Sequence, residues 1–170
     1  MRSPVLGTGL PLSEEAYLEL GETTERIELF DGSPYLTARG QPRHQFILGK
    51  LMDALQPAAT ASGLHLMGPV NLRLRRDRIT NPDLIMTGPI DFDSPVVDAR
   101  SAVLVAEVAS RSDEVIRLLK HHFYATAGIP WFLLVEEETG VLHLHQLATS
   151  EITAWPAIAA LTPEDLLPPS

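Results

Sequence analysis

The pattern of hydrophobic and polar residues is most distinctive over residues 101–110, where an apolar run is broken by a single charge, Glu107. A continuous run of this length, rich in valine and alanine, is typical of a strand buried on both faces of a sheet. An ionised carboxylate in such a strand is costly unless it is paired, bound to a metal or protonated. Glu107 therefore needs partners from elsewhere in the chain.

Before this strand, the pattern changes between helical and strand periods. Ser13, followed by two glutamates, predicts a helix start, and Asp31-Gly32 after an alternating run predicts a hairpin turn. Pro42 suits the first turn of a helix and precedes apolar residues at helical spacing. The expected elements are a helix over 13–21, hairpin strands over 26–30 and 33–37, a helix over 42–63, strands over 64–67 and 70–74, a charged turn over 75–78 and a strand over 84–86.

Beyond the central strand, we expect a helix over 112–127, strands over 131–135, 141–147 and 151–155, and a surface tail over 156–170. The strand–helix–strand unit in this part should be parallel and right-handed. The sum is an α+β fold with an α/β-like core, in which one mixed β-sheet is flanked by helices and preceded by an N-terminal helix and β-hairpin. At this length we expect one domain, residues 1–170.

Composition narrows the class of protein. Hydrophobic residues make up 45% and charged residues 21% of the chain, as in globular proteins. The apolar runs are too short to span a bilayer, so we expect no membrane association. Residues 1–10 lack the sustained apolar core of a secretory signal. The absence of cysteine excludes disulfides and thiolate metal sites and favours a cytoplasmic location.

The net charge of −9 argues against nucleic-acid binding through the overall field, so such a contact needs a local basic patch. Basic residues do gather on both sides of the central strand. They are Arg73, Arg75, Arg76 and Arg78 before it, and Arg111, Arg117, Lys120, His121 and His122 after it. Such clusters suit a phosphate backbone. The alternative is that the first cluster lies outward on a hairpin and is merely solvated.

Asp83 and Lys120 are the first candidates to meet Glu107. Asp83 follows Asn81-Pro82 at the mouth of a short strand, and two carboxylates on neighbouring strands suit Mg²⁺ or Mn²⁺. Lys120 lies at the edge of the apolar stripe of the next helix, and its ammonium can reach back because helical side chains lean toward the N-terminus. The structural alternatives are a loop-capping aspartate and a snorkelling lysine.

The remaining candidates are weaker. His44 falls on the inward face of its helix, where a histidine is more often a satisfied core residue than a catalyst. Glu28 alternates with apolar neighbours and is expected on the solvated side of the hairpin. His143 and His145 share one strand face and can bind Zn²⁺, but no third ligand has suitable spacing. The adjacent pair His121-His122 does not converge easily on one ion.

The order and spacing of these residues resemble the Uma family, which is assigned to the PD-(D/E)XK nuclease superfamily of restriction endonuclease-like proteins. The resemblance runs from about Leu12 to about Leu147. The residues that carry it are Arg26-Ile27-Glu28-Leu29-Phe30-Asp31-Gly32, His44-Gln45, Asn81-Pro82-Asp83, Val105-Ala106-Glu107-Val108-Ala109-Ser110, Lys120, Tyr124 and Gly128.

The resemblance implies a mixed four-stranded sheet core flanked by helices and a metal-dependent phosphodiesterase site. Pro82-Asp83 match the family's PD and Glu107 its second acid. The lysine usually found two residues later is replaced by Ala109, and Lys120 matches the place on the next helix to which the family moves it. Asp83, Glu107 and a backbone carbonyl near Val108 would then hold Mg²⁺ or Mn²⁺.

The leading hypothesis is therefore a metal-dependent endonuclease that hydrolyses DNA phosphodiester bonds. The metal would activate a water and polarise the phosphoryl oxygen. Lys120 would orient that water or stabilise the developing charge, and His44 or Glu28 would complete the catalytic pocket. A weaker hypothesis is hydrolysis of another small phosphoester at the same site.

The alternative from a different class is a nuclease fold that no longer cuts and serves as a nucleic-acid or protein interaction module, with a homodimer as one form. The acidic net charge favours it. The segment between Glu107 and Lys120 also favours it, because this segment is one residue shorter than in the family. Asp113 would then be a displaced counterpart of the aspartate that the family often has before its lysine. There, Ser110-Arg111-Ser112 stands where the family commonly has Ser-Pro-Ser, and Ile116 stands where it often has an aspartate.

Overall fold

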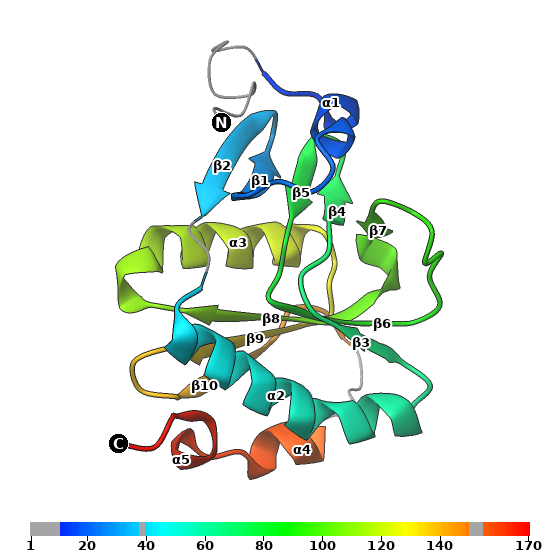
Figure 1. The fold of residues 1–170 in the computed structure, drawn as a ribbon. Coiled ribbons are helices and arrows are strands. Elements are labelled where there is room, and N and C mark those ends of the chain that lie inside the picture. The colour runs from blue at the N-terminus through cyan, green and yellow to red at the C-terminus, as the bar shows by residue number, and fades with distance from the viewer. Residues whose placement is uncertain (1–10, 38–39, 150–154) are drawn as a thin grey trace.

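The computed structural model describes residues 11–37, 40–149 and 155–170. Its elements follow the predicted order, with short strands and helices added (Figure 1). They are α1 (Glu14–Glu19), β1 (Arg26–Phe30), β2 (Ser33–Thr37), α2 (Pro42–Ala61), β3 (His65–Met67), β4 (Leu72–Arg75), β5 (Arg78–Thr80), β6 (Leu84–Thr87), β7 (Val97–Asp98), β8 (Ala102–Ala109), α3 (Glu114–Thr126), β9 (Trp131–Glu136), β10 (Leu142–Gln146), α4 (Trp155–Ala160) and α5 (Pro163–Leu166).

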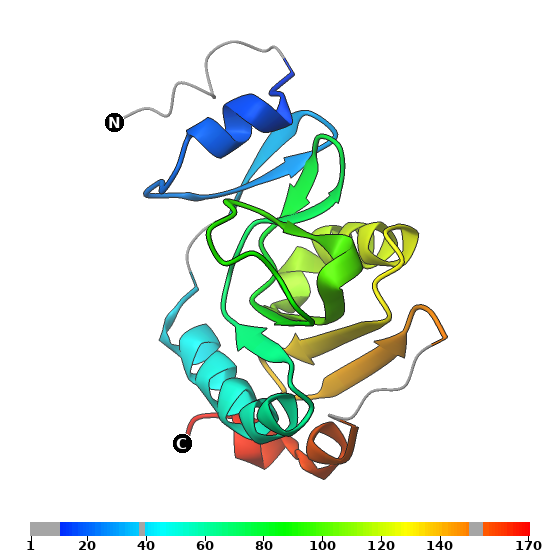
Figure 2. The same ribbon diagram turned by 90° about the vertical axis from the view of Figure 1, so that its right-hand side faces the viewer.

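The strands form two five-stranded sheets, where one mixed sheet was expected. The N-terminal sheet has the order β2-β1-β5-β4-β7, and the C-terminal sheet has the order β10-β9-β8-β6-β3. Each contains one parallel pair, β4–β7 in the first and β8–β9 in the second, so both are mixed. Figure 2 shows the N-terminal sheet standing above the C-terminal one. The α+β class and the parallel β8–α3–β9 unit agree with the prediction.

The division into two sheets takes place at Asn81-Pro82-Asp83, between β5 and β6. Pro82 has no amide hydrogen to donate to a ladder, so a strand cannot continue regularly through it. On one side of this break β5 pairs with the hairpin strand β1, and on the other side β6 pairs with β8. The sequence around Arg78 was expected to be only a charged turn, and β5 was therefore missed. The turn itself lies at Asp77, which has a positive φ of 60°.

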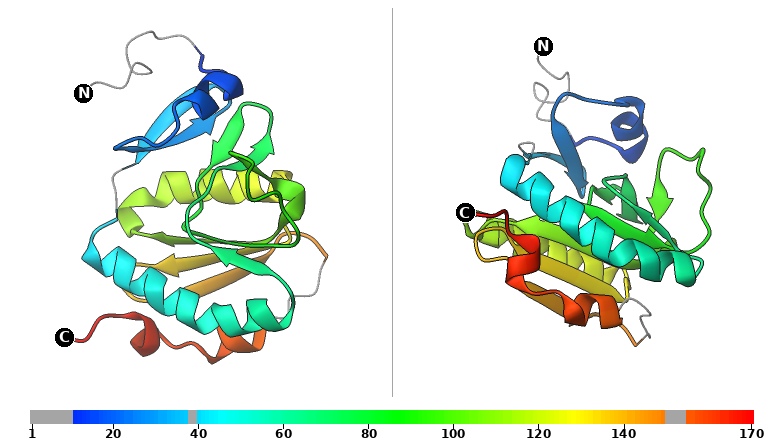
Figure 3. Two further views of the ribbon diagram at one scale, coloured as in Figure 1. Left: turned by 45° about the vertical axis from the view of Figure 1, so that its right-hand side comes forward. Right: turned by 60° about the horizontal axis from the view of Figure 1, so that its bottom comes forward.

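The alternation of side chains along β8 separates two cores. Leu104, Ala106 and Val108 pack in the core that α2 covers, together with Ile158 of α4 and Leu166 of α5. The view in the right half of Figure 3 shows α2, α4 and α5 together on this face. The opposite face of the C-terminal sheet, which carries Val105 and by the same alternation Glu107, is covered by α3 and by the N-terminal sheet.

The C-terminal region was predicted less well. The strand expected over 151–155 falls mostly on residues 151–154, which lie outside the described residues, and Trp155 begins α4. The surface tail contains two short helices that bury Ile158 and Leu166 completely or nearly so. Within the described ranges, none of the helices has the length and apolar character needed to cross a membrane.

Candidate active site

Three carboxylates and three basic side chains from five segments of the chain meet between the two sheets. Glu28 and Arg26 come from β1, His44 from α2, Asp83 from the segment before β6, Glu107 from β8 and Lys120 from α3. Five of the six are buried: Glu28 is 1% exposed, Asp83 2%, Lys120 5%, Glu107 8% and His44 9%. A cluster with this much buried charge must be internally paired to be tolerated.

Asp83 is bonded through both of its carboxylate oxygens. Its Oδ1 lies 2.8 Å from Nη1 of Arg26 and 3.2 Å from Nε2 of His44. Its Oδ2 accepts a hydrogen bond of 2.8 Å from the amide of Val108. Burial alone would raise the pKa of Asp83, but the bond with His44 and the charge of Arg26 outweigh it, so the pKa lies well below its usual range. Asp83 is thus turned into the cluster and does not cap its loop.

His44 is held by the same contact. Its hydrogen bond to Asp83 raises the pKa of the imidazole, and burial opposes this shift only in part. The inward position of His44 was predicted, but its neighbour is a carboxylate as well as the core residues of α2. Among the described residues, His44 therefore contacts the acid Asp83 and makes no hydrogen bond or ion pair with Glu107.

Glu107 lies one position before Val108 and faces α3. Its Oε1 accepts a hydrogen bond of 2.6 Å from the hydroxyl of Tyr124 and lies 2.5 Å from Nζ of Lys120. Burial raises the pKa of Glu107 to about 7, although the charge of Lys120 opposes the rise. Burial likewise raises the pKa of Tyr124 well above its usual value, so the phenol stays protonated and can donate.

Lys120 bridges two carboxylates. Its Nζ is 2.8 Å from Oε1 of Glu28 as well as 2.5 Å from Glu107. Burial alone would lower the pKa of Lys120, but the two carboxylates outweigh burial and raise it. A snorkelling lysine would have its ammonium in water, whereas this side chain is only 7% exposed. The helical lysine therefore reaches the strand acid, as its position on the stripe predicted.

Glu28 was expected to be solvated, and this expectation is wrong. It accepts hydrogen bonds from Lys120 and from the amide of Asn81, the latter at 2.7 Å. The expectation assumed that one face of the hairpin is open to solvent. It failed because β1 is covered on both faces, with Ile27, Glu28 and Leu29 all buried. Arg26, two residues before Glu28 on the same face, was not among the candidates either. The sequence did contain a signal for both residues, namely the two-residue spacing of their opposite charges in a strand. That strand adjoins Asn81-Pro82-Asp83, called the NPD segment below.

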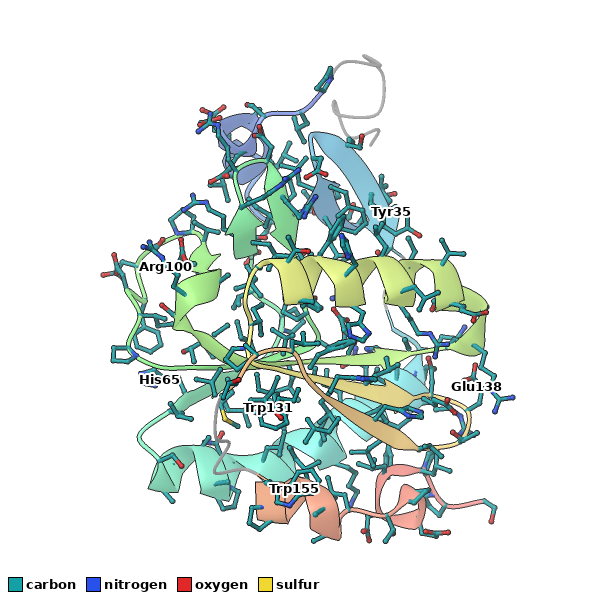
Figure 4. The ribbon with its side chains drawn as sticks, turned by 180° about the vertical axis from the view of Figure 1, so that it is seen from behind. Tyr35, His65, Arg100, Trp131, Glu138 and Trp155 are labelled. Carbon is teal, nitrogen blue, oxygen red and sulfur yellow. The ribbon has the colours of Figure 1, made fainter. Side chains whose placement is uncertain are left out.

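A cavity of about 860 Å³ opens onto the cluster and is also lined by Arg43 and Arg117. A second cavity, of about 930 Å³, shares Arg26, His44 and Asp83 with the first. Tyr35 and Glu138, which also line the first cavity, lie on the same side of the molecule beside the N-terminal end of α3 (Figure 4). The cluster is thus accessible from this side and is large enough in outline for a nucleotide-sized ligand.

The two predicted basic clusters have different roles. The one before Asp83 is engaged in structural ion pairs: Arg73 with Glu14, Arg76 with Glu15, and both Arg75 and Arg78 with Asp31. It does not line the cavity that contains Glu107. Of the second cluster, Arg117 and Lys120 do line it. Among the described residues, the arginine and lysine side chains that line this cavity are Arg26, Arg43, Arg117 and Lys120.

The histidines considered for zinc, on α3 and β10, are not among the six residues of this cluster. His143 and His145 share a face of β10, and the ring of His121 lies 4.6 Å from that of His145, centroid to centroid. Nε2 of His143 contacts Glu136 at 3.2 Å. Over the ranges that the structure describes, however, no three or more histidine, aspartate or glutamate side chains are arranged to hold one metal ion. The geometry therefore gives no support to the zinc hypothesis.

For Mg²⁺ or Mn²⁺, the fit depends on the donor chemistry of two residues. Asp83 and Glu107 provide hard carboxylate oxygens. The hydrogen bond from the amide of Val108 holds Asp83 beside the residue that directly follows Glu107 in β8. Two carboxylates are few for a closed protein site but suit Mg²⁺, which keeps several waters. The residues present therefore fit such an ion. Val108 takes part through its amide, and the contact predicted for its carbonyl stays a prediction.

Comparisons with known proteins agree with this fold. The model of the Uma2 family, described as "Putative restriction endonuclease", matches residues 14–170. Among solved structures, the crystal structure of a "putative nuclease belonging to DUF820" from Anabaena variabilis has a TM-score of 0.73 and 14% sequence identity, over 92% of this chain and 97% of that one. At this identity the likeness concerns the fold alone. No curated protein matches the chain.

Proposed function

The chain belongs to the Uma2 family of putative restriction endonucleases, and we propose that it is a metal-dependent endonuclease, formed by one nuclease-like domain, that hydrolyses DNA phosphodiester bonds. The observation that carries the proposal is the position of Lys120, a buried ammonium held between two acids, Glu28 and Glu107. Phosphoryl transfer is favoured by a fixed positive group next to a carboxylate pair that binds a metal. Lys120 would be that positive group, and Glu107 with Asp83 would be the carboxylate pair.

Asp83 and Glu107 would hold Mg²⁺ or Mn²⁺. When bound, such an ion supplies Lewis acidity, which polarises a phosphoryl oxygen and makes water a stronger nucleophile. His44 and the amide of Val108 fix the orientation of Asp83, and Tyr124 fixes that of Glu107. Because these partners are themselves buried, the two acids cannot rotate freely, and the site is preorganised.

Lys120 would stabilise the charge that develops on the phosphoryl group. An ammonium has three donors, and two of them are directed at Glu28 and Glu107. The third is available for a phosphoryl oxygen or for the attacking water. Glu28 would then act through Lys120, because its carboxylate holds the ammonium in place. Arg43 and Arg117 line the same cavity and would contact the DNA backbone.

The test is cleavage of supercoiled plasmid and of short duplexes in Mg²⁺ and in Mn²⁺. We expect Asp83→Ala to abolish cleavage and Lys120→Met to slow it by about 10²-fold or more. The control is Arg100→Ala, because Arg100 pairs only with Asp98 at the surface and its side chain is 90% exposed. Cleavage by Asp83→Ala at the wild-type rate would refute the proposal.

A second candidate function is an interaction module that has kept the fold without cutting. The observation that favours it is the saturation of Asp83, whose oxygens are already bonded to Arg26, His44 and Val108. Titration calorimetry with Mn²⁺ distinguishes the two functions. No heat of binding to the wild-type protein, and no change in Glu107→Gln, would favour the module.

A further inference from the structure

Arg26 lies among all three carboxylates of the cluster, although the chemistry proposed above does not use it. Its Nη1 is 2.8 Å from Oδ1 of Asp83. Burial alone would lower the pKa of its guanidinium, but Asp83, Glu107 and Glu28, in this order of strength, raise the pKa above its ordinary value. The positive charge of Arg26 is thus stabilised by the same acids that the proposed function assigns to the metal site.

Among the described residues, the only side-chain hydrogen bond from the Arg26 guanidinium is the one from Nη1 to Asp83. Its Nε and Nη2 are buried and have no hydrogen-bond partner among the described residues. Arg78, a buried arginine of the same sheet, differs in this respect. Its Nε and Nη2 both donate to Asp31, at 2.9 and 2.6 Å, and its guanidinium stacks 3.9 Å from the ring centre of Phe123. Arg26 is therefore held to the cluster through its single charged hydrogen bond with Asp83, whereas Arg78 is fixed by two hydrogen bonds and a stacking contact.

The charges of the cluster divide into two parts. Lys120 contacts Glu28 and Glu107, while Arg26 contacts Asp83. Without Arg26, the hydrogen-bond partners left to the Asp83 carboxylate among the described residues would be His44 and the amide of Val108. A buried carboxylate with so little compensation is strongly destabilising. The protein therefore needs a cation beside Asp83 whenever no metal is present.

We propose that Arg26 is an internal cation that occupies Oδ1 of Asp83 and competes with the divalent ion for this carboxylate. The inference rests on the proposed function, because it concerns the same site. Binding of the metal must displace the guanidinium or weaken its contact with Asp83, and the metal affinity is reduced by the free energy of that step. Arg26 is accordingly a positioning residue that keeps Asp83 in place before the metal arrives.

The proposal predicts a change of metal affinity opposite to that expected for a structural arginine. Replacing Arg26 by the uncharged Met removes the competitor, so the Kd for Mn²⁺ should fall by about tenfold or more, equivalent to about 1.4 kcal/mol. A purely structural Arg26 would instead make Arg26→Met bind Mn²⁺ more weakly, because the acids would lose their arrangement. The competition thus has a readout that is independent of cleavage.

The experiment is calorimetric titration of Mn²⁺ into the wild type, Arg26→Met, Arg78→Met and Asp83→Asn at about pH 8, where carboxylates of ordinary pKa are ionised. Arg78→Met is the matched control, because Arg78 is an arginine of the same sheet that is also paired with an aspartate, but its partner is Asp31. We expect tighter binding for Arg26→Met alone, unchanged binding for Arg78→Met and none for Asp83→Asn. The increase in melting temperature caused by Mn²⁺ should also be largest for Arg26→Met.

The outcomes separate the two proposals. If the wild type binds Mn²⁺ through Asp83 and Arg26→Met binds it equally or more weakly, the competition is refuted while the metal site stands. If neither protein binds Mn²⁺, both proposals are refuted. If Arg26→Met does not fold, the NMR signal of the Arg26 Nε–H group in the wild type decides: it should shift on addition of Mg²⁺, and a signal that stays in place refutes the competition.

Discussion

Replacement of Lys120 by Met tests the charge balance of the cluster most directly. The substitution keeps much of the aliphatic stem and removes an ammonium that lies 2.5 Å from Glu107 and 2.8 Å from Glu28. The side chains of these acids are only 10% and 2% exposed. Water therefore cannot replace the lost cation, and the two carboxylates are left close together without their main partner.

The expected cost follows from this burial. Breaking a buried ion pair by removing one partner costs about 3–5 kcal/mol, which for a chain of this size lowers the melting temperature by about 6–20 °C. The cost should depend on pH. Burial already raises the pKa of Glu107 to about 7 in the presence of Lys120, and loss of Lys120 raises it further. At about pH 5, Glu107 is then neutral in the variant, and only Glu28 lacks its partner.

The assay is urea unfolding of the wild type and Lys120→Met at about pH 5 and about pH 8. Lys50→Met is the control, because Lys50 is an exposed lysine on a helix, near the ring of Phe46, and should cost less than about 1 kcal/mol. We expect a large loss of stability for Lys120→Met at the higher pH and a smaller loss at the lower pH. A loss below about 1 kcal/mol, or an equal loss at both pH values, would refute the argument that Lys120 compensates buried charge.

Three further predictions concern single groups of the cluster. Burial raises the pKa of Glu107 to about 7 from 4.5, so ionisation of this group costs stability as the pH rises between these values. Glu107→Gln should therefore raise the melting temperature at about pH 8 and change it little at about pH 4.5. A lower melting temperature at both pH values would contradict this prediction. The hydrogen bond to Asp83 raises the pKa of His44. The protonated imidazole therefore stabilises the protein fully below the pKa of His44 in the unfolded state, and this contribution is lost as the pH rises through the higher pKa of the folded state. An NMR titration should show the raised pKa in the wild type and a return toward 6.5 in Asp83→Asn. Tyr124→Phe removes a donor to Glu107 and should cost about 1–2 kcal/mol in thermal unfolding and raise the pKa of Glu107 further; an unchanged carboxyl titration would contradict this.

The α+β class and the family were predictable because they rest on local patterns. The apolar run of β8, the NPD segment and the apolar stripe of α3 each keep their meaning regardless of tertiary context. The match to the Uma2 family over residues 14–170 confirms the resemblance. The contact of Lys120 with Glu107 was predictable for the same reason, since helix geometry limits where a side chain at the edge of a stripe can reach.

The division into two sheets and the burial of Glu28 were not predictable in this way. Both depend on which strand pairs with β1, and β1 pairs with β5, a strand of three residues taken for part of a turn. Once β5 joins the hairpin to the segment before Asp83, the face of β1 that carries Arg26 and Glu28 lies against the cluster. A pattern of alternation shows that two side chains share a face, but not whether that face is covered.

The position of Arg26 and Glu28 on one strand has a consequence for how the cluster responds to a ligand. Glu28 holds Lys120, and Arg26 holds Asp83, so one two-residue step of β1 supplies a countercharge to each part of the cluster. A metal at Asp83 would oppose Arg26 but leave the Glu28–Lys120 pair intact. Both the Arg26→Met and the Lys120→Met variants should therefore lose stability, but Arg26→Met should raise the metal affinity, whereas Lys120→Met should slow cleavage. If both variants changed metal affinity in the same direction and by the same amount, the cluster would act as a single unit, and the separate roles assigned to Arg26 and Lys120 would be wrong.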